Sequence, residues 1–267
     1  MILSEKSCGM RAGRWLLWLV MAGVIIWAFA GPARQVPVAL RGMPFMLDYL
    51  LGMIPPDLAV LPPMWQPLLE TIRMAIAGTV LSTAIALPLS LLAARNTAPS
   101  HAVQEVTRGL LSFLRAMPAM IWAMLFVSLS GLGSLAGILG ITCHATGAIG
   151  KMFLECIEAT GPKIEDVLEA MRLDGATEAQ AIRWGIIPEV LPLFASYVLY
   201  RLESVIRTSS ILGLVGAGGL GLELTMAIRM FRRQEALAII LLVLVLVATV
   251  DSASGWLRRY VLKRSGY

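Results

Sequence analysis

The sequence predicts an all-α, polytopic membrane protein with about six transmembrane helices. Of its 267 residues, 58 % are apolar and 15 % are charged, which is too apolar for a soluble domain. Two runs without any charge, residues 15–30 and 236–250, mark the first and the last expected span. Four further stretches are mostly apolar and have about the 20 residues that a membrane-crossing helix needs. These stretches are residues 71–94, 110–130, 133–154 and 188–206.

Residues 1–67 are expected to hold an N-terminal transmembrane helix and a Pro-rich extracytoplasmic segment. The apolar run at 15–30 also fits a cleaved signal peptide, because a basic start precedes it and Ala28 and Ala30 match the small-residue cleavage pattern. Its length and its tryptophans favour a retained first helix. Residues 31–67 contain eight of the 14 prolines, and proline lacks the N–H that a helix needs. An irregular segment is therefore predicted there.

Basic residues near both ends of the chain indicate its orientation. Lysine and arginine are frequent at residues 6–14 and 258–264, and these residue types concentrate on the cytoplasmic side of membrane proteins. Both termini are therefore expected in the cytoplasm, although Arg229, Arg232 and Arg233 run against this bias. Topology accounts for the net charge of +5, so no nucleic-acid binding is inferred.

No catalytic or metal-binding signature is found in the sequence. A phosphate-binding loop of the form G-x-x-x-x-G-K-[ST] does not occur, so the chain itself is not expected to hydrolyse ATP. The cysteines (Cys8, Cys143 and Cys156) lack zinc-ligand spacing, and the histidines (His101 and His144) lie far apart. We therefore predict no catalytic residue, no metal site and no cofactor in this chain.

A charged, amphipathic segment at residues 160–188 separates two apolar stretches. Four apolar residues follow one helical stripe: Ile164, Val167, Leu168 and Met171. Thr177 and Gln180 have the spacing of a capping box, in which each side chain binds the other's backbone N–H. Two short helices broken at Gly175 are therefore predicted, forming a cytoplasmic hairpin that suits a socket on another protein.

Glycines crowd the segment that follows the fifth expected span. They are Gly213, Gly216, Gly218, Gly219 and Gly221. Residues 216–221 formally match G-x-G-x-x-G, but the dinucleotide fingerprint needs a preceding β-strand and this segment follows a membrane helix. Irregular backbone at membrane depth survives only inside protein or beside a wet cavity. The segment is therefore either a flexible extracytoplasmic gate or a tight packing turn.

Ionisable side chains within the expected spans are costly and mark candidate sites on the translocation path. Arg115 lies near a helix end, where its guanidinium can also reach the headgroups. Glu203 and Arg207 are spaced i, i+4 and can neutralise each other. That pairing leaves Arg201 unmatched and suited to attract an oxyanion. Asp251, near the inner end of the last span, is expected either to pair with a nearby base or to cap, and not to relay protons.

Several stretches resemble the permease subunit of phosphonate-type ABC importers, with methionine-type permeases as the next nearest. The resemblance rests on A-A-R-N at 93–96, R-A-M-P at 115–118 and L-G-L-V-G-A-G-G-L-G at 212–221, together with an EAA-type loop that starts at Glu169. In that loop Met171 replaces the usual second alanine. The resemblance covers most of the chain after Leu68 and implies a type I permease core over residues 68–267.

The resemblance implies how the chain assembles. Two permease copies would form a homodimer in the bacterial inner membrane, in contact with membrane lipid and with an extracytoplasmic solute-binding protein. Cytoplasmic ATPases, which bind the ATP and Mg²⁺, would dock on the 160–188 loop. The implied docking residues are Glu169, Ala170, Met171, Gly175, Ala176 and Pro188.

The implied function is import of phosphonate, phosphite or a related phosphorus oxyanion. Three alternatives are an ABC permease for another small solute such as methionine, an ion-coupled secondary transporter, and a membrane scaffold or sensor. A secondary transporter would want carboxylate or histidine relays within its spans and inverted repeats, and neither is apparent. A scaffold would need neither the amphipathic loop nor the glycine-rich segment.

Overall fold

The computed structural model describes residues 5–159, 169–171, 173, 175–177, 180 and 182–264. The chain divides into two compact units, Met1–Ile54 and Pro55–Tyr267. Every regular element within the described ranges is helical, as predicted. Four helices are long and apolar enough to cross a membrane, or up to six if each of two bent helix pairs is one span.

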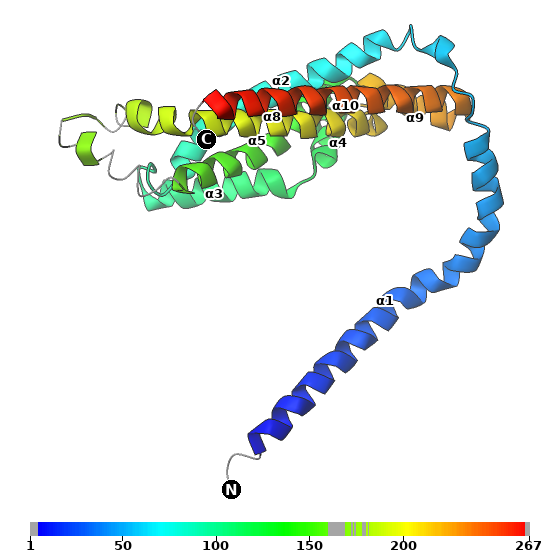
Figure 1. Cartoon of the computed structure of the whole chain (residues 1–267), viewed down its shortest axis with the longest axis horizontal. Coiled ribbons are helices and arrows are strands. Elements are labelled where there is room, and N and C mark those ends of the chain that lie inside the picture. Colours follow the sequence, from blue (N-terminus) through cyan, green and yellow to red (C-terminus); the bar gives the residue numbers. More distant parts are fainter. Residues whose placement is uncertain are drawn as a thin grey trace. The chain divides into compact units, whose positions relative to one another are not determined.

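The first unit consists mainly of one helix, α1, which runs from Glu5 to Leu51 (Figure 1). Three prolines lie inside it: Pro32, Pro37 and Pro44. The prediction of an irregular segment over residues 31–67 is therefore wrong as far as Leu51. The prolines lie more than one helical turn apart and each removes one backbone hydrogen bond, so the helix bends instead of ending. Its arms, Leu17–Pro32 and Gln35–Leu51, meet at 43°.

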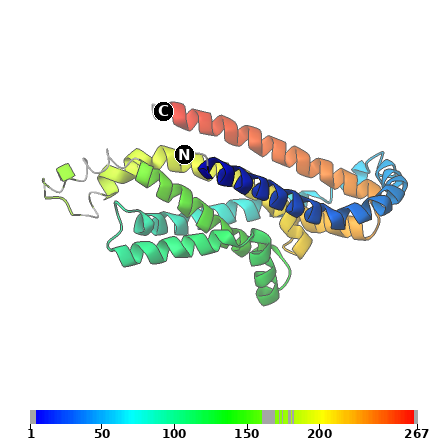
Figure 2. The same ribbon diagram turned by 90° about the horizontal axis from the view of Figure 1, so that it is seen from below.

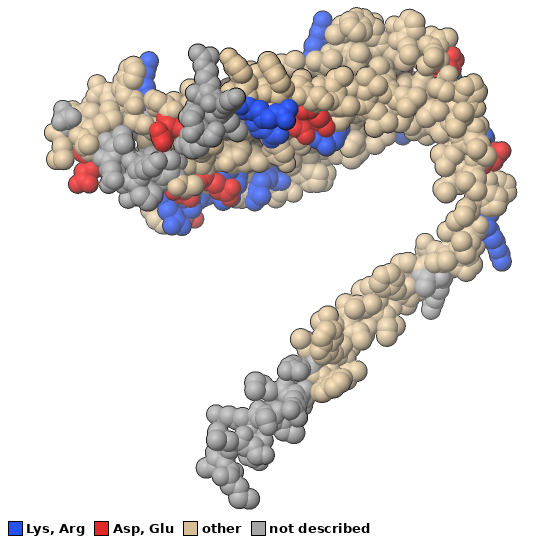
Figure 3. Space-filling model, in the orientation of Figure 1, with Lys and Arg blue, Asp and Glu red and all other residues tan. Residues whose placement is uncertain are grey.

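The second unit is a helical bundle (Figures 1 and 2). Its long helices are α2 (Trp65–Ala93), α5 (Ser134–Ala159), α8 (Ile187–Leu212) and α10 (Arg233–Arg264). Its shorter elements are α3 (His101–Ala116), α4 (Ala119–Ser130), α9 (Gly219–Arg229), the 3₁₀ turns η1 (Leu58–Val60) and η3 (Gly213–Val215), and the π turn η2 (Ile182–Ile186). Most of its visible surface is neither acidic nor basic (Figure 3), as expected for helices that face lipid.

The stretch predicted as one span at residues 110–130 is instead shared by two helices. α3 and α4 meet at 86°, and the break falls at Met117 and Pro118. Met117 is extended, with ψ 126°, because a proline ring disfavours the helical conformation in the residue before it. The proline therefore turns the chain inside the bundle.

Helix α5 forms the centre of the bundle. In its apolar window 67 % of the residues are buried, against 17–33 % for the other three candidate spans. A Cβ on Gly140 would lie 2.7 Å from the backbone N of Ala123, and one on Gly147 would lie 2.5 Å from the backbone N of Arg115. Small residues at these positions allow α3 and α4 to pack directly against the backbone of α5.

The helical structure is interrupted between α8 and α9, inside the bundle. The start of α9 lies beside Glu70 and Thr71, which are one to two helical turns, or about 8 Å, into α2. Beyond α9 the chain reaches the end of the bundle, where the Asp57 N–H donates to the Gln234 carbonyl at 3.3 Å. Helix α9 is thus a half-length helix that fills one end of the bundle.

Candidate functional site

The glycine-rich segment forms a buried turn. Gly216, Gly218 and Gly219 have φ values of 86°, 85° and 67°, in the left-handed region that favours glycine. Ala217 and Leu220 are completely buried. The irregular backbone is therefore enclosed by protein, which is the condition under which it is tolerated at membrane depth.

Glycine is required at positions 213 and 221 because other backbone atoms come very close, and not because φ is positive there. A Cβ on Gly213 would lie 2.1 Å from the carbonyl carbon of Gly221, and a Cβ on Gly221 would lie 2.0 Å from the Ser210 carbonyl oxygen. Both clashes involve backbone atoms that cannot move aside independently. The structure thus brings the predicted glycines together in one tightly packed turn between α8 and α9.

Two side chains of α2 bind the start of α9. Glu70 Oε2 accepts the Gly219 N–H at 3.0 Å, and Thr71 Oγ1 accepts the Leu220 N–H at 2.9 Å. The Thr71 hydroxyl also donates to the Pro67 carbonyl at 2.9 Å. The first N–H groups of a helix lack partners within that helix, and a carboxylate is favourable there because of the helix dipole.

Glu70 and Thr71 are not among the site residues predicted from the sequence. The available signal was a glutamate close to the start of an otherwise apolar stretch, since such residues are rare in spans without a role. Its partner, the N-terminus of α9, lies 149 positions away and could not be inferred from spacing.

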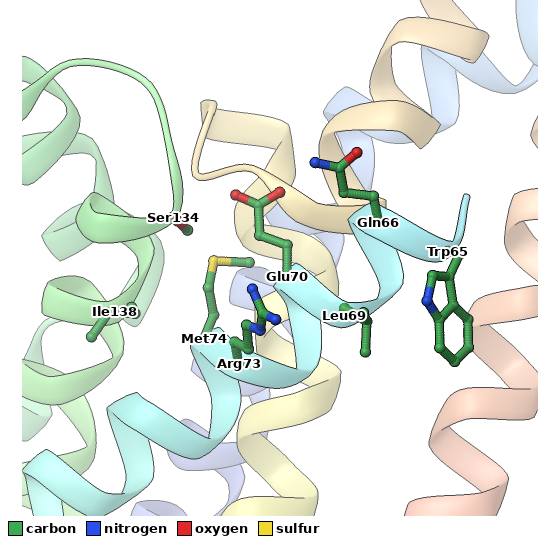
Figure 4. A pocket seen from close by; sticks show the side chains of 8 residues that line it. All are labelled: Trp65, Gln66, Leu69, Glu70, Arg73, Met74, Ser134 and Ile138. Carbon is green, nitrogen blue, oxygen red and sulfur yellow. The ribbon is translucent and has the colours of Figure 1, made fainter. Parts of the chain in front are cut away.

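A cavity of about 740 Å³ opens beside this contact (Figure 4). It is lined by Trp65, Gln66, Leu69, Glu70, Arg73, Met74, Ser134 and Ile138. Glu70 and Arg73 project into it from neighbouring turns of α2. Within the described residues Arg73 forms no ion pair, although it lies one turn from the carboxylate that caps α9.

Helix α8 carries the predicted ion pair. Arg207 Nη2 donates to Glu203 Oε1 at 2.9 Å, and Asp251 Oδ1 of α10 lies 3.8 Å from the same nitrogen. Asp251 therefore has a basic partner, as expected. It lies near the middle of α10 and not near the inner end, because the helix continues to Arg264. The Arg207 side chain is 53 % exposed on the surface of this single chain.

Arg201 lies deeper and is differently placed. Its Nε atom is buried and has no hydrogen-bond partner among the described residues. His144 of α5 lies within electrostatic range of both Arg201 and Arg115. Its Nδ1 is 2.9 Å from the Met117 carbonyl, which can only accept, so Nδ1 carries the proton. Side chains of α3, α5 and α8 thus create a basic region near the α3–α4 break.

Part of the amphipathic segment at residues 160–188, hereafter the coupling segment, lies within the described residues. Glu169, Ala170 and Met171 are helical, and Gly175 has a φ of 83°. The Ala176 N–H donates to the Met171 carbonyl at 2.9 Å, which is the 6→1 bond of a Schellman motif. The predicted break at Gly175 is confirmed. The stripe residues Ile164, Val167 and Leu168 lie outside the described residues.

The predicted capping box is also present. The Thr177 N–H donates to Gln180 Oε1 at 2.8 Å, and the Gln180 N–H donates to Thr177 Oγ1 at 3.3 Å. The chain then enters α8 through the π turn η2, with Pro188 in the first turn of α8, where its missing N–H removes no helix bond. Like Glu169 and Ala170, Pro188 is exposed and accessible to a partner.

A polar network joins the ends of α2 and α5 to the middle of α3, directly before the coupling segment. The Glu158 carboxylate of α5 accepts from the Arg108 guanidinium of α3, and from the Arg95 N–H at 3.1 Å. Arg108 Nε also donates to the Ala93 carbonyl at the end of α2, at 2.9 Å. The network therefore fixes the ends of α2 and α5 relative to the middle of α3.

The family of the chain follows from comparison with known proteins. The family of binding-protein-dependent transport system inner membrane components matches residues 86–265. This range includes the glycine-rich turn at residues 213–221 (the glycine turn), the ion pair of α8 and the coupling segment. The chain belongs to this family. The permease is thus a multi-pass inner membrane component of an ABC importer, with a separate ATPase subunit and a binding protein as partners. ATP is bound by the ATPase partner, and the alternatives of a secondary transporter and of a scaffold are set aside.

Relatives of known name support the same family. The permease is 40 % identical over 228 residues to a putative phosphite transport system permease protein (HtxC) of Stutzerimonas stutzeri, covering 85 % of this chain and 80 % of that one. It is 39 % identical to the phosphite transport system permease protein PtxC of the same organism, covering 83 % and 79 %. A structure of the MetNI methionine ABC transporter shares the fold, with a TM-score of 0.66 and 22 % identity over 77 % of this chain and 99 % of that one.

Proposed function

We propose that the permease forms half of a homodimeric importer for phosphite, phosphonate or a related phosphorus oxyanion. The observation that carries this proposal is its 40 % identity, over 85 % of the chain, to a putative phosphite permease. A second relative at 39 % identity is also named for phosphite transport. Because the sequence identity to both relatives extends over most of each chain, we expect a similar translocation path.

The charges of the bundle support an anionic substrate. Arg201 has a buried Nε without a hydrogen-bond partner in the part of the chain that is described, and His144 lies within electrostatic range of both Arg201 and Arg115. Guanidinium groups bind phosphorus oxyanions through charge-assisted hydrogen bonds. In this proposal Arg201 provides the main attraction on the path, and Arg115 raises the positive potential around it.

The glycine turn is proposed as the outer gate. A gate must exchange two packed arrangements, and glycine at positions 213, 216 and 221 leaves no side chain that would obstruct a change in the packing of the turn. The turn lies at the end of the bundle where α2 and α10 begin. The orientation with both termini in the cytoplasm places that end outside.

The segment around Gly175 is proposed as the ATPase-docking element, with Glu169, Ala170, Met171, Ala176 and Pro188. Its exposed residues and its two local caps make a stiff projection that a partner can push. The Glu158 network would pass that movement from α5 to the end of α2 and to the middle of α3.

The second copy is proposed to cover the face that carries Arg207 and Asp251. Their side chains are 53 % and 37 % exposed, yet they lie within the spans. Charged groups at this depth face other protein or a water-filled path. A homodimer with this face towards the path satisfies that requirement without a further subunit type.

The experiment that tests the proposed function is reconstitution with the cognate ATPase and binding protein in proteoliposomes. ATP-dependent uptake of phosphite or a simple phosphonate is expected, and the other phosphorus oxyanion should compete for it. Methionine should neither be taken up nor compete. Uptake of methionine without any effect of phosphite or phosphonate would overturn the substrate assignment.

A further inference from the structure

Two side chains of α2 bind the glycine turn where α9 begins. Glu70 and Thr71 accept the N–H groups of Gly219 and Leu220, at 3.0 and 2.9 Å. The fit is close, since a Cβ on Gly219 would lie 2.4 Å from Thr71 Oγ1. Movement of the turn away from α2 must therefore break these two bonds.

A second partner for the Glu70 carboxylate lies on the same helix. Arg73 is three residues further along α2, on the same face, and lines the same cavity (Figure 4). The i, i+3 spacing allows a carboxylate and a guanidinium to pair directly. In the described part of the chain Arg73 has no ion-pair partner, so it is available when Glu70 leaves α9.

We propose that Glu70 is a positioning residue that exchanges partners during gating. When the turn is packed, Glu70 and Thr71 hold α9 against α2; when the turn moves away, Glu70 pairs with Arg73. This inference rests on the proposed role of the glycine turn as a gate. It adds that α2 residues, outside the segment matched by the family, set the balance between the closed and the open gate.

The exchange has a physical reason. A carboxylate that loses its hydrogen-bond donors within a partly buried site is strongly penalised, and a second cationic partner removes most of that penalty. Two arrangements of similar free energy are what a gate needs if a modest input is to switch it. The cavity of about 740 Å³ gives the Glu70 side chain room to turn.

The test measures how fast the turn becomes accessible. Ala217, which is completely buried in the turn, is replaced by cysteine, and labelling by a membrane-impermeant maleimide is followed in the complete complex in proteoliposomes. In this background both variants should label faster than the parent: E70Q, which removes the charge from its bond, on the order of tenfold, and T71V, which removes a neutral bond, roughly fivefold. T71S, which keeps the hydroxyl acceptor, should label at the parental rate.

R73Q should have the opposite effect. Without its alternative partner Glu70 remains on α9, so labelling should be slower than in the parent. Labelling of R73Q at or above the parental rate would overturn the proposed exchange of Glu70 from α9 to Arg73. Unchanged rates in both E70Q and T71V would overturn the proposal that Glu70 and Thr71 hold α9 against α2, which we call the latch. A purely structural contribution of these residues would loosen the turn in all three variants.

Two controls keep the result interpretable. Cys156 is buried in α5 and should remain protected in every variant, which excludes general unfolding as the cause of faster labelling. If A217C disturbs packing, S209C is a second reporter, because Ser209 is completely buried and thiol and hydroxyl are similar in size.

Failure of the gate can be told apart from failure of the latch. ATP should change the labelling rate of the parental A217C complex if the turn is a gate. An unchanged rate removes the gate, whereas a changed rate with unaffected E70Q and T71V removes only the latch. Identification of another solute would leave both results in place.

Discussion

Arg201 and Arg207 lie in one helix but in different electrostatic settings. Arg207 has two carboxylates beside it, Glu203 at 2.9 Å and Asp251 at 3.8 Å. Arg201 has a buried Nε without a partner among the described residues and a second arginine within electrostatic range of its neighbour His144. In the proposed function an oxyanion would therefore be attracted to Arg201 more strongly than to Arg207, whose charge is already balanced by carboxylates.

The first prediction separates these two arginines. R201Q should weaken substrate interaction and raise the KM of uptake about tenfold or more, because a charge-assisted hydrogen bond contributes about 1.5–3 kcal/mol. R201K, which keeps the charge, should lose less. Uptake kinetics in proteoliposomes measure both variants.

R207Q serves as the matched comparison. It leaves Glu203 and Asp251 without their base, so the expected loss is in the amount of stable complex, with a smaller change in KM. Equal KM values for R201Q and the parent would remove Arg201 from the path.

The second prediction concerns Gly213. G213A places a Cβ 2.1 Å from the carbonyl carbon of Gly221, so the turn must open or shift. A loss of about 1–3 kcal/mol in stability is expected from such overpacking. The apparent unfolding temperature of the purified complex measures it. G109A is the control, because nothing lies within 4 Å of a Cβ there, and it should be neutral or slightly stabilising.

The coupling segment depends on one backbone conformation. Gly175 has a φ of 83°, which ends the helix containing Glu169 and allows the Ala176 N–H to bind the Met171 carbonyl. The capping box of Thr177 and Gln180 starts the next helix two residues later. The direction in which the exposed helix projects is thus set within a few residues.

The third prediction tests this conformation. Asparagine tolerates the left-handed region and valine does not, at a cost of about 1–2 kcal/mol for residues with a Cβ. G175N should therefore retain most uptake, whereas G175V should lose most of it while membrane insertion stays normal. Co-purification of the ATPase reports docking. Full uptake by G175V would show that the turn does not orient the docking element.

The fourth prediction concerns the Glu158 network between α2, α3 and α5. E158Q removes the charge that holds Arg108 and the Arg95 N–H, so force from the coupling segment should pass less well to α2 and α3. We expect substrate transported per ATP hydrolysed to fall about fivefold, the lower range of allosteric coupling.

E155Q is its matched control. Glu155 lies one turn earlier in α5 and pairs only with Lys151 at the surface within the described residues, at 3.2 Å. Exposed pairs of this kind contribute about 0–1 kcal/mol, so coupling should be unchanged. A similar loss of coupling in both variants would remove the special role of the Glu158 network.

At the scale of the whole importer, the question is how many copies of this permease the complex contains. The exposed Arg207 and Asp251 side chains within the spans require a protein or water-lined surface opposite them. The fifth prediction is that native mass spectrometry of the complex finds two copies of this permease with two ATPases. A complex with one copy and a related but different permease would contradict the homodimer.

The sequence was informative wherever the signal is local. The all-α class, the pair of Glu203 and Arg207, and the break at Gly175 follow from composition, an i, i+4 spacing and a glycine. The number of prolines in residues 31–67 did not predict that the helix continues through Pro32. A proline bends a helix without ending it when the neighbouring turns keep their hydrogen bonds. The contact of Glu70 with Gly219 joins distant segments, and only the packing of the bundle brings them together.

Helix α1 is longer than a bilayer is thick. Its residues from Glu5 to Leu51 extend about 70 Å at 1.5 Å per residue, whereas the hydrocarbon core measures about 30 Å. The arm Leu17–Pro32 has no charged residue, and the arm Gln35–Leu51 contains Arg41 and Asp48. One bilayer crossing cannot take up the whole of this helix, so we propose that the first arm crosses the lipid tails and that the charged second arm lies at or beyond the headgroups.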